Sequence, residues 1–408
     1  MSTELLDSGQ PFDRLVRAIL QVAMLIFVWT IGIGILNGLD LVEFEEKVLL
    51  SHLHGGTLGW MTLGILAFAL WLFAGERTAD SSEGEWIRGV AILAVIAIPL
   101  YVVAFATTRE ILRPIAGTAV WVALIALAVW AFMRARQTPT LTVPHLLALL
   151  GLVSSVIGGT FGVLNGIALA RGWADYPDAL FDAHPGTMEI GFVVPVAMGV
   201  SEWVLRLGTP DEKPSRSGYV QVVLMFLAFA WVLTFILADQ EEIVGLGILF
   251  GIVAVGIFYK RVWSLIRATS LMERSAARHA VLGAFFIGVT FVYIFVIITN
   301  AQGDFEAIPE GQGISFVHLM AIGATTNALL AFVTHLSRRR SEPGIVDDVI
   351  FWGVNIGLAG FVIALTTDVR GLIGVFTPLM GLALLTAVVT HVTALAKGPD
   401  ASIPAPAE

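Results

Sequence analysis

The chain has 408 residues, of which 57% are hydrophobic and only 13% are charged. This composition excludes the soluble globular class and predicts a polytopic membrane protein. The formal net charge is −9 and there is no cysteine, so disulfides, thiolate metal sites and cysteine nucleophiles are excluded.

Apolar windows of about 20 residues predict an all-α membrane protein with twelve transmembrane helices in one domain, residues 1–408. The predicted spans lie near residues 14–37, 51–75, 88–107, 113–134, 144–169, 181–207, 218–238, 242–260, 278–300, 314–336, 348–367 and 372–396. Arg14 and Arg17 precede the long apolar run of the first span, which has no obvious small-residue cleavage site. The first span is therefore predicted to stay in the protein as a transmembrane helix.

The charges divide unevenly between the two sets of loops. The termini and the even-to-odd loops hold roughly 18 of the 23 Lys and Arg residues, so the positive-inside rule predicts an inner or plasma membrane protein with both termini in the cytoplasm. The opposite loops are acidic, as in "LDLVEFEEK" and "LADQEEI". They are either ordinary solvated loops or a docking surface for a basic electron-donor protein. No strand or phosphate-loop pattern points to nucleotides or nucleic acid.

An internal repeat joins the second, sixth and tenth spans. Their starts share a frame of two sites separated by one residue, with a glycine five positions after the second site: "HLHGGTLGW" from His52, "HPGTMEIGF" from His184 and "FVHLMAIGA" from Phe316. The three glycines of the frame are equally spaced along the chain. The recurrence predicts three four-helix units in a pseudo-threefold ring, near residues 14–134, 144–260 and 278–396. The alternative is a chance likeness among glycine-rich apolar helices.

The two sites of each frame point in different directions. Residues two positions apart on an α-helix are separated by about 200°, so each central helix offers one site to each neighbour. In one arrangement of the ring His52 faces His318 and His54 faces His184. The opposite rotation pairs only His184 with His318. The first arrangement leaves fewer histidines unpaired and is the more economical.

A facing histidine pair between two helices suits the two axial positions of a haem. The candidate iron ligands are His52, His318, His54 and His184. A porphyrin close to the helix backbone needs small residues beside it, and the candidates are Gly55, Gly56, Gly59, Gly186, Gly191 and Gly323, with Ala324. The alternatives are close helix packing for the glycines and hydrogen-bonded interfacial imidazoles for the histidines.

Three charged residues are further candidates. Arg109 and Arg370 occupy similar positions after the third and eleventh spans, where they would either bind haem propionates or anchor the helices at the membrane interface. Glu189 lies five positions after His184, inside the sixth span. It would relay protons, hydrogen-bond a ligand histidine or satisfy neighbouring Asn or Thr side chains, because a carboxylate at this depth needs a role or a partner.

In these features the chain resembles the haem-copper oxidase subunit I superfamily: twelve helices in three arcs, with histidines at the outer ends of helices 2, 6 and 10. The resemblance implies that His52 or His54, together with His318, ligates a low-spin haem. The chain departs from the family at the high-spin haem ligand, where Phe316 stands, and in the seventh span, which has no histidine. "HLHGGTLGW" is also similar to the H-x-H motif of NnrS proteins, which are associated with haem, copper and nitric oxide stress.

The leading hypothesis is a haem-binding membrane redox protein with one or two haem b groups, for electron transfer or for nitric oxide or oxygen chemistry. The alternatives are a transporter without haem and a reductase with an unusual metal centre. Copper remains open, although the chain lacks a full ligand set for it. Whether the protein is an enzyme, and which residues would be catalytic, stay undecided. The depth of the site in the membrane separates the haem protein from the transporter, since a transporter site should lie near the membrane midplane.

Overall fold

A computed structural model describes residues 11–75, 81–107, 110–338 and 340–397. In these ranges the chain is all-helical, and twelve helical stretches are long and apolar enough to cross a membrane, as predicted. Nine are single α-helices: α1 (Asp13–Gly38), α4 (Ser82–Ala106), α5 (Leu112–Ala135), α6 (Val143–Arg171), α9 (Arg216–Leu237), α10 (Val244–Ala268), α11 (Ala276–Asn300), α14 (Ile345–Thr366) and α15 (Arg370–Ala396).

The other three stretches, the second, sixth and tenth, are α-helices interrupted by a π-helix. They are α2 (Glu46–His54), η2 (Gly55–Thr62) and α3 (Leu63–Phe73); α7 (Asp178–Gly186), η3 (Thr187–Val193) and α8 (Val194–Leu205); and α12 (Glu310–His318), η5 (Leu319–Thr326) and α13 (Asn327–Ser337). The three π-helices begin at equal intervals along the chain, as the glycines of the repeat do. π-Helical turns inside α-helices are frequent at functional sites, and here each one closely follows a histidine.

These three composite spans form the centre of the bundle. In each of them 83% of the most apolar window is buried within the protein, whereas the other nine spans are between 33% and 50% buried. Each π-helix packs against the preceding helix of its own repeat: α1 against η2, α6 against η3 and α11 against η5. The nine outer spans therefore shield a central trio from lipid.

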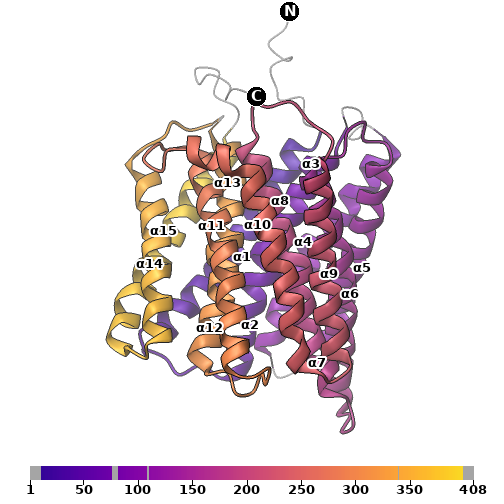
Figure 1. Ribbon diagram of the computed structural model, residues 1–408, viewed down its shortest axis with the longest axis vertical. Coiled ribbons are helices and arrows are strands. Elements are labelled where there is room, and N and C mark those ends of the chain that lie inside the picture. The colour runs from indigo at the N-terminus through magenta and orange to yellow at the C-terminus, as the bar shows by residue number, and fades with distance from the viewer. Residues whose placement is uncertain (1–10, 76–80, 108–109, 339, 398–408) are drawn as a thin grey trace, which may run out of the picture.

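The two ends of the central trio differ. Figure 1 shows α2, α7 and α12 at the lower end of the bundle and α3, α8 and α13 at the upper end. The candidate histidines lie in α2, α7 and α12, so we call the lower end the histidine end. At the upper end, here called the opposite end, Trp71, Trp203 and His335 recur with the same spacing as the repeat glycines. The ring of His335 lies 6.5 Å from Trp71 and 5.4 Å from Trp203, centroid to centroid, so the three helices converge there.

Local capping explains where several spans begin and end. Ser81 accepts a hydrogen bond from the backbone N–H of Gly84 at the start of α4, and Ser215 does the same for Gly218 at the start of α9. These side chains satisfy N–H groups that the first helical turn leaves free. α6 ends at Gly172, whose φ of 62° is a left-handed conformation that glycine adopts without strain.

Candidate functional site

A cavity of about 500 Å³ lies at the histidine end between α1, α2, α12 and α15. His52 and His318 both line it, from different repeats. Most of the other lining side chains are apolar, among them Phe27, Ile31, Trp60, Ile314, Phe361 and Leu384. Glu310 is the one carboxylate among the described residues of its wall. The cavity is large enough for a drug-sized or cofactor-sized ligand.

The two first-site histidines hydrogen-bond across to the preceding helix. His52 Nδ1 lies 2.8 Å from the carbonyl oxygen of Thr30 in α1. His184 Nδ1 lies 2.8 Å from the carbonyl oxygen of Gly158 in α6. Thr30 and Gly158 hold corresponding places in α1 and α6, since each lies seven positions before the asparagine of an "LNG" sequence. The same bond therefore orients both rings.

The two second-site histidines bond within their own helices instead. His54 Nδ1 lies 2.8 Å from the carbonyl oxygen of Leu50, and His318 Nδ1 lies 2.8 Å from that of Ile314. In both cases the acceptor is four positions earlier in the chain. The four candidate histidines thus form two matched sets, as the predicted frame of two sites requires.

These bonds determine which ring nitrogen is available. A carbonyl oxygen only accepts, so Nδ1 carries the proton in all four rings and Nε2 keeps its lone pair. Among the described residues, none of the four Nε2 atoms has a hydrogen-bond partner. An Nδ1–H bonded to a carbonyl is the usual second contact of a metal-ligating histidine. All four rings therefore keep an Nε2 lone pair that no described residue uses.

Other histidines of the bundle are bonded differently. His145 uses Nδ1 in the cap of α6 and holds Nε2 3.2 Å from the carbonyl oxygen of Leu72. His391 Nδ1 contacts the hydroxyl of Ser337, and His279 Nδ1 contacts the side-chain oxygen of Asn327. The bond from Nδ1 to a backbone carbonyl, found in all four candidate histidines, is not shared by His145, His279 or His391.

The structure brings the candidate histidines together in pairs. His52 and His318 share the cavity, and their imidazoles are within electrostatic range of each other. His184 is likewise within electrostatic range of His54. This is the pairing of the first of the two arrangements considered from the sequence.

Aromatic and cationic groups surround His54. Its ring stacks on Phe105 with centroids 3.8 Å apart and meets the edge of Tyr101 at 5.9 Å. The guanidinium of Arg113 lies 5.1 Å from the centroid of Phe105, and Arg113 is within electrostatic range of His54. Arg113 is thus a cation close to the pair formed by His54 and His184. The sequence alone did not distinguish it from the other cations of the loops at this end.

Two glycines let the first-site rings approach the neighbouring backbone. A Cβ atom on Gly34 would lie 3.2 Å from Cε1 of His52, and one on Gly162 would lie 2.8 Å from Cε1 of His184. Each glycine follows the hydrogen-bond acceptor of its histidine by one helical turn, so Gly34 and Gly162 also hold corresponding places in their repeats. Neither glycine was predicted from the sequence, although the two hold matching positions in the first and fifth spans.

Of the glycines predicted to clear space for a porphyrin, Gly56 lines the cavity and the others do not. The Cβ positions of four of these others face side chains of neighbouring helices: Thr30 at 2.6 Å for Gly55, Ile26 for Gly59, Phe229 at 2.5 Å for Gly191 and Phe286 at 2.7 Å for Gly323. The glycines that line the cavity are Gly34, Gly56, Gly313 and Gly381. Gly55, Gly59, Gly191 and Gly323 therefore serve close helix packing, the alternative interpretation of the pattern.

The remaining predicted site residues are the charged ones, Arg109, Arg370 and Glu189. Arg109 lies outside the described residues, and Arg370 begins α15 with a side chain that is also outside them. Glu189 lies in η3 and has no hydrogen bond or ion pair among the described residues. Its repeat equivalents, Thr57 and Ala321, both line the cavity.

Across the described part of the chain, no three histidine or carboxylate side chains converge to hold a metal ion. The candidate histidines occur as pairs. Two protein ligands suit a metal ion whose other coordination positions are filled by a cofactor. In comparisons with known proteins, no family model and no curated protein matches the chain.

Proposed function

We propose that this chain is a haem-binding integral membrane redox protein, with His52 and His318 as the axial ligands of a haem b. One observation carries the proposal: two imidazoles with available Nε2 atoms line the same apolar cavity of about 500 Å³. Their Nδ1 bonds to the carbonyls of Thr30 and Ile314 fix both rings and increase the basicity of Nε2.

The residues present fit a haem in chemistry as well as in size. A porphyrin supplies four nitrogen ligands, so two imidazoles complete the six positions of the iron. The apolar wall, with Phe27, Ile31 and Leu384, matches the faces of the macrocycle. When bound, the haem would supply one-electron chemistry. The chain's own contribution is to hold the axial ligands, exclude water and thereby set the reduction potential.

A second haem b is proposed between His54 and His184. The support is the Nδ1 bonding of these rings to backbone carbonyls and their electrostatic proximity. Arg113 beside His54 supplies a positive charge suited to a propionate. His52 and His54 both lie on α2, so the two proposed haems would share one helix. That closeness favours electron transfer between them.

Electron transfer is the proposed role, in preference to a reaction on nitric oxide or oxygen. Two histidines holding each haem would leave no open position on its iron, whereas catalysis on a diatomic ligand needs one. Within the described residues no third group joins either pair to hold copper. We place Glu189, half-buried and without a partner among the described residues, as the candidate proton carrier of the second pair.

By the positive-inside rule, we propose an inner or plasma membrane location with cytoplasmic termini. The histidine end then faces outward. Asp178 and Glu306 both lie within electrostatic range of Asp182 at that end. A basic soluble protein is the electron donor that such a surface would attract, because opposite charge accelerates encounter.

Carbon monoxide tests the proposed role. The spectrum of the dithionite-reduced protein should not change on adding CO, because both axial positions of each haem are held by imidazole. The measurement is a CO difference spectrum of the purified full-length protein. A CO-shifted Soret band of full amplitude would contradict electron transfer as the role and would favour chemistry on a diatomic ligand.

A further inference from the structure

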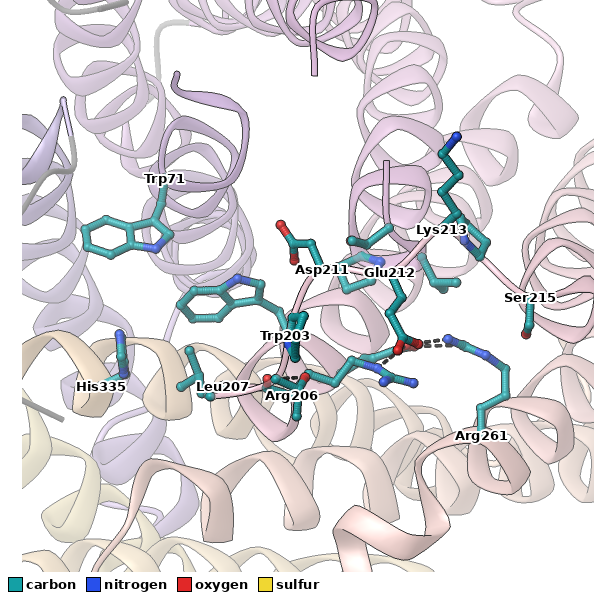
Figure 2. Close-up of a pocket in the computed structure, with 18 residues that line it drawn as sticks. Trp71, Trp203, Arg206, Leu207, Asp211, Glu212, Lys213, Ser215, Arg261 and His335 are labelled. Atoms are coloured by element: carbon teal, nitrogen blue, oxygen red, sulfur yellow. Dashed lines mark hydrogen bonds and ion pairs between the residues drawn. The ribbon is translucent and has the colours of Figure 1, made fainter. Parts of the chain in front are cut away.

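A second cavity, of about 530 Å³, lies at the opposite end of the central helices. Figure 2 shows its two kinds of wall. One side carries Trp71, Trp203 and His335, the aromatic residues on which the three repeats converge. The other side carries charged residues of α8, α10 and the segment between α8 and α9. This cavity has no part in the proposed haem site.

A buried carboxylate anchors the charged wall. Glu202 is 1% exposed and accepts hydrogen bonds from Nε of Arg206 at 3.0 Å and from Nη1 of Arg261 at 2.8 Å. Nη1 of Arg261 also donates to the side-chain oxygen of Gln221 at 2.7 Å. Two guanidinium groups on one carboxylate leave an excess of one positive charge, and the network holds both arginines in place.

The segment between α8 and α9 carries charges of both signs. Asp211, Glu212 and Lys213 line the cavity and are exposed. Arg216 follows at the start of α9 and is also exposed. Among the described residues, neither Lys213 nor Arg216 has an ion-pair partner. Two carboxylates and two free cations are therefore available to a ligand that itself carries both signs.

An apolar groove continues from the cavity along the outside of α9. Pro214 borders both the cavity and the groove, and the groove is lined further by Arg216, Tyr219, Val220, Val223 and Leu224. Tyr219 is 51% exposed and Val223 is 54% exposed. Because α9 is a candidate membrane span, these side chains face the acyl region next to the interface.

We propose that this cavity and groove bind a phospholipid with a primary ammonium headgroup, of the phosphatidylethanolamine type. The phosphate would bind Lys213 and Arg216, and an acyl chain would follow Val220 and Val223. The ammonium would enter the cavity, where the carboxylates of Asp211 and Glu212 and the Trp203 ring favour a cation. A purely anionic headgroup would leave both carboxylates unpaired, and a quaternary ammonium could not donate hydrogen bonds to them as a primary ammonium does.

Native mass spectrometry of the full-length protein in detergent tests the proposal. Equimolar phosphatidylethanolamine, phosphatidylglycerol and phosphatidylcholine are added, and the retained lipid is counted. Phosphatidylethanolamine should be retained preferentially. The double variant Lys213→Gln, Arg216→Gln should reduce its retention about tenfold, which corresponds to about 1.4 kcal/mol. Both side chains are exposed, so the variant should fold. Arg267→Gln, an exposed cation of α10 outside the cavity, should retain lipid as the unmodified protein does.

Two competitors added in the same experiment distinguish binding of the whole lipid from binding of its headgroup alone. Phosphoethanolamine and inorganic phosphate, added at the same concentration, should not displace the lipid, because neither has a chain to occupy the groove. Displacement by either would overturn the assignment of the groove. Equal retention of the three lipids, preference for phosphatidylglycerol, or no effect of the double variant would overturn the proposal. None of these outcomes depends on haem content.

Discussion

Replacing His318 with alanine is expected to abolish haem binding at the first cavity while the second site keeps its haem. His318 and His52 come from different repeats, and the removal of either leaves the iron with a single protein ligand. The neighbouring Ile314 carbonyl loses only its imidazole partner, so the helix itself should be unaffected. The measurement is the haem-to-protein ratio of the purified variant, which should fall from two to one.

Two matched variants sharpen this result. His54→Ala, on the same helix as His52, should remove the other haem and spare the first. His391→Gln changes a histidine away from both pairs, and the new amide can still hydrogen-bond Ser337. This variant should leave the haem-to-protein ratio at two. If His318→Ala and His391→Gln lose haem equally, or neither loses any, the assignment of the axial ligands is wrong.

Replacing Gly34 with valine is expected to weaken haem binding at the first cavity through the position of His52. A Cβ on Gly34 would already lie 3.2 Å from Cε1 of the imidazole, so the larger side chain must push the ring away. Overpacking costs about 1–3 kcal/mol, which corresponds to a loss of affinity of roughly 5- to 150-fold. Haem titration of the apoprotein, followed by the Soret absorbance, measures this loss.

Gly32 provides the control for this prediction. It lies earlier on the same helix, and a Cβ at this position would meet nothing within 4 Å. Gly32→Val changes helix propensity in the same way as Gly34→Val but touches neither ring. The two variants should therefore differ in haem affinity at the first cavity. Equal affinities would mean that the approach of His52 to α1 does not position an axial ligand.

The number of spans and the location of the histidines could be predicted from the sequence. Span length follows from bilayer thickness, and His52, His184 and His318 fall at the starts of three long apolar runs. The constant spacing of the repeat glycines predicted that the frames are equivalent, and the π-helices follow the same spacing. The matched Nδ1 bonds of the first-site histidines agree with that equivalence.

The directions in which other residues of the central spans point could not be predicted, because a π-helix interrupts the α-helix in each of these spans. η2 begins at Gly55, and a π-helix turns less per residue than an α-helix. An α-helical wheel therefore misplaces Gly59, which faces Ile26 of α1 rather than the cavity. The acceptors of the histidine bonds were also out of reach, since a backbone carbonyl such as that of Gly158 has no signature in the sequence.

The most direct test of the central claim is the reduced-minus-oxidised absorbance spectrum of the purified protein, expressed with an ample haem supply. The bands of a low-spin, bis-imidazole b-type haem are expected, with two haems per chain. A colourless, haem-free protein that is folded by circular dichroism would contradict the claim.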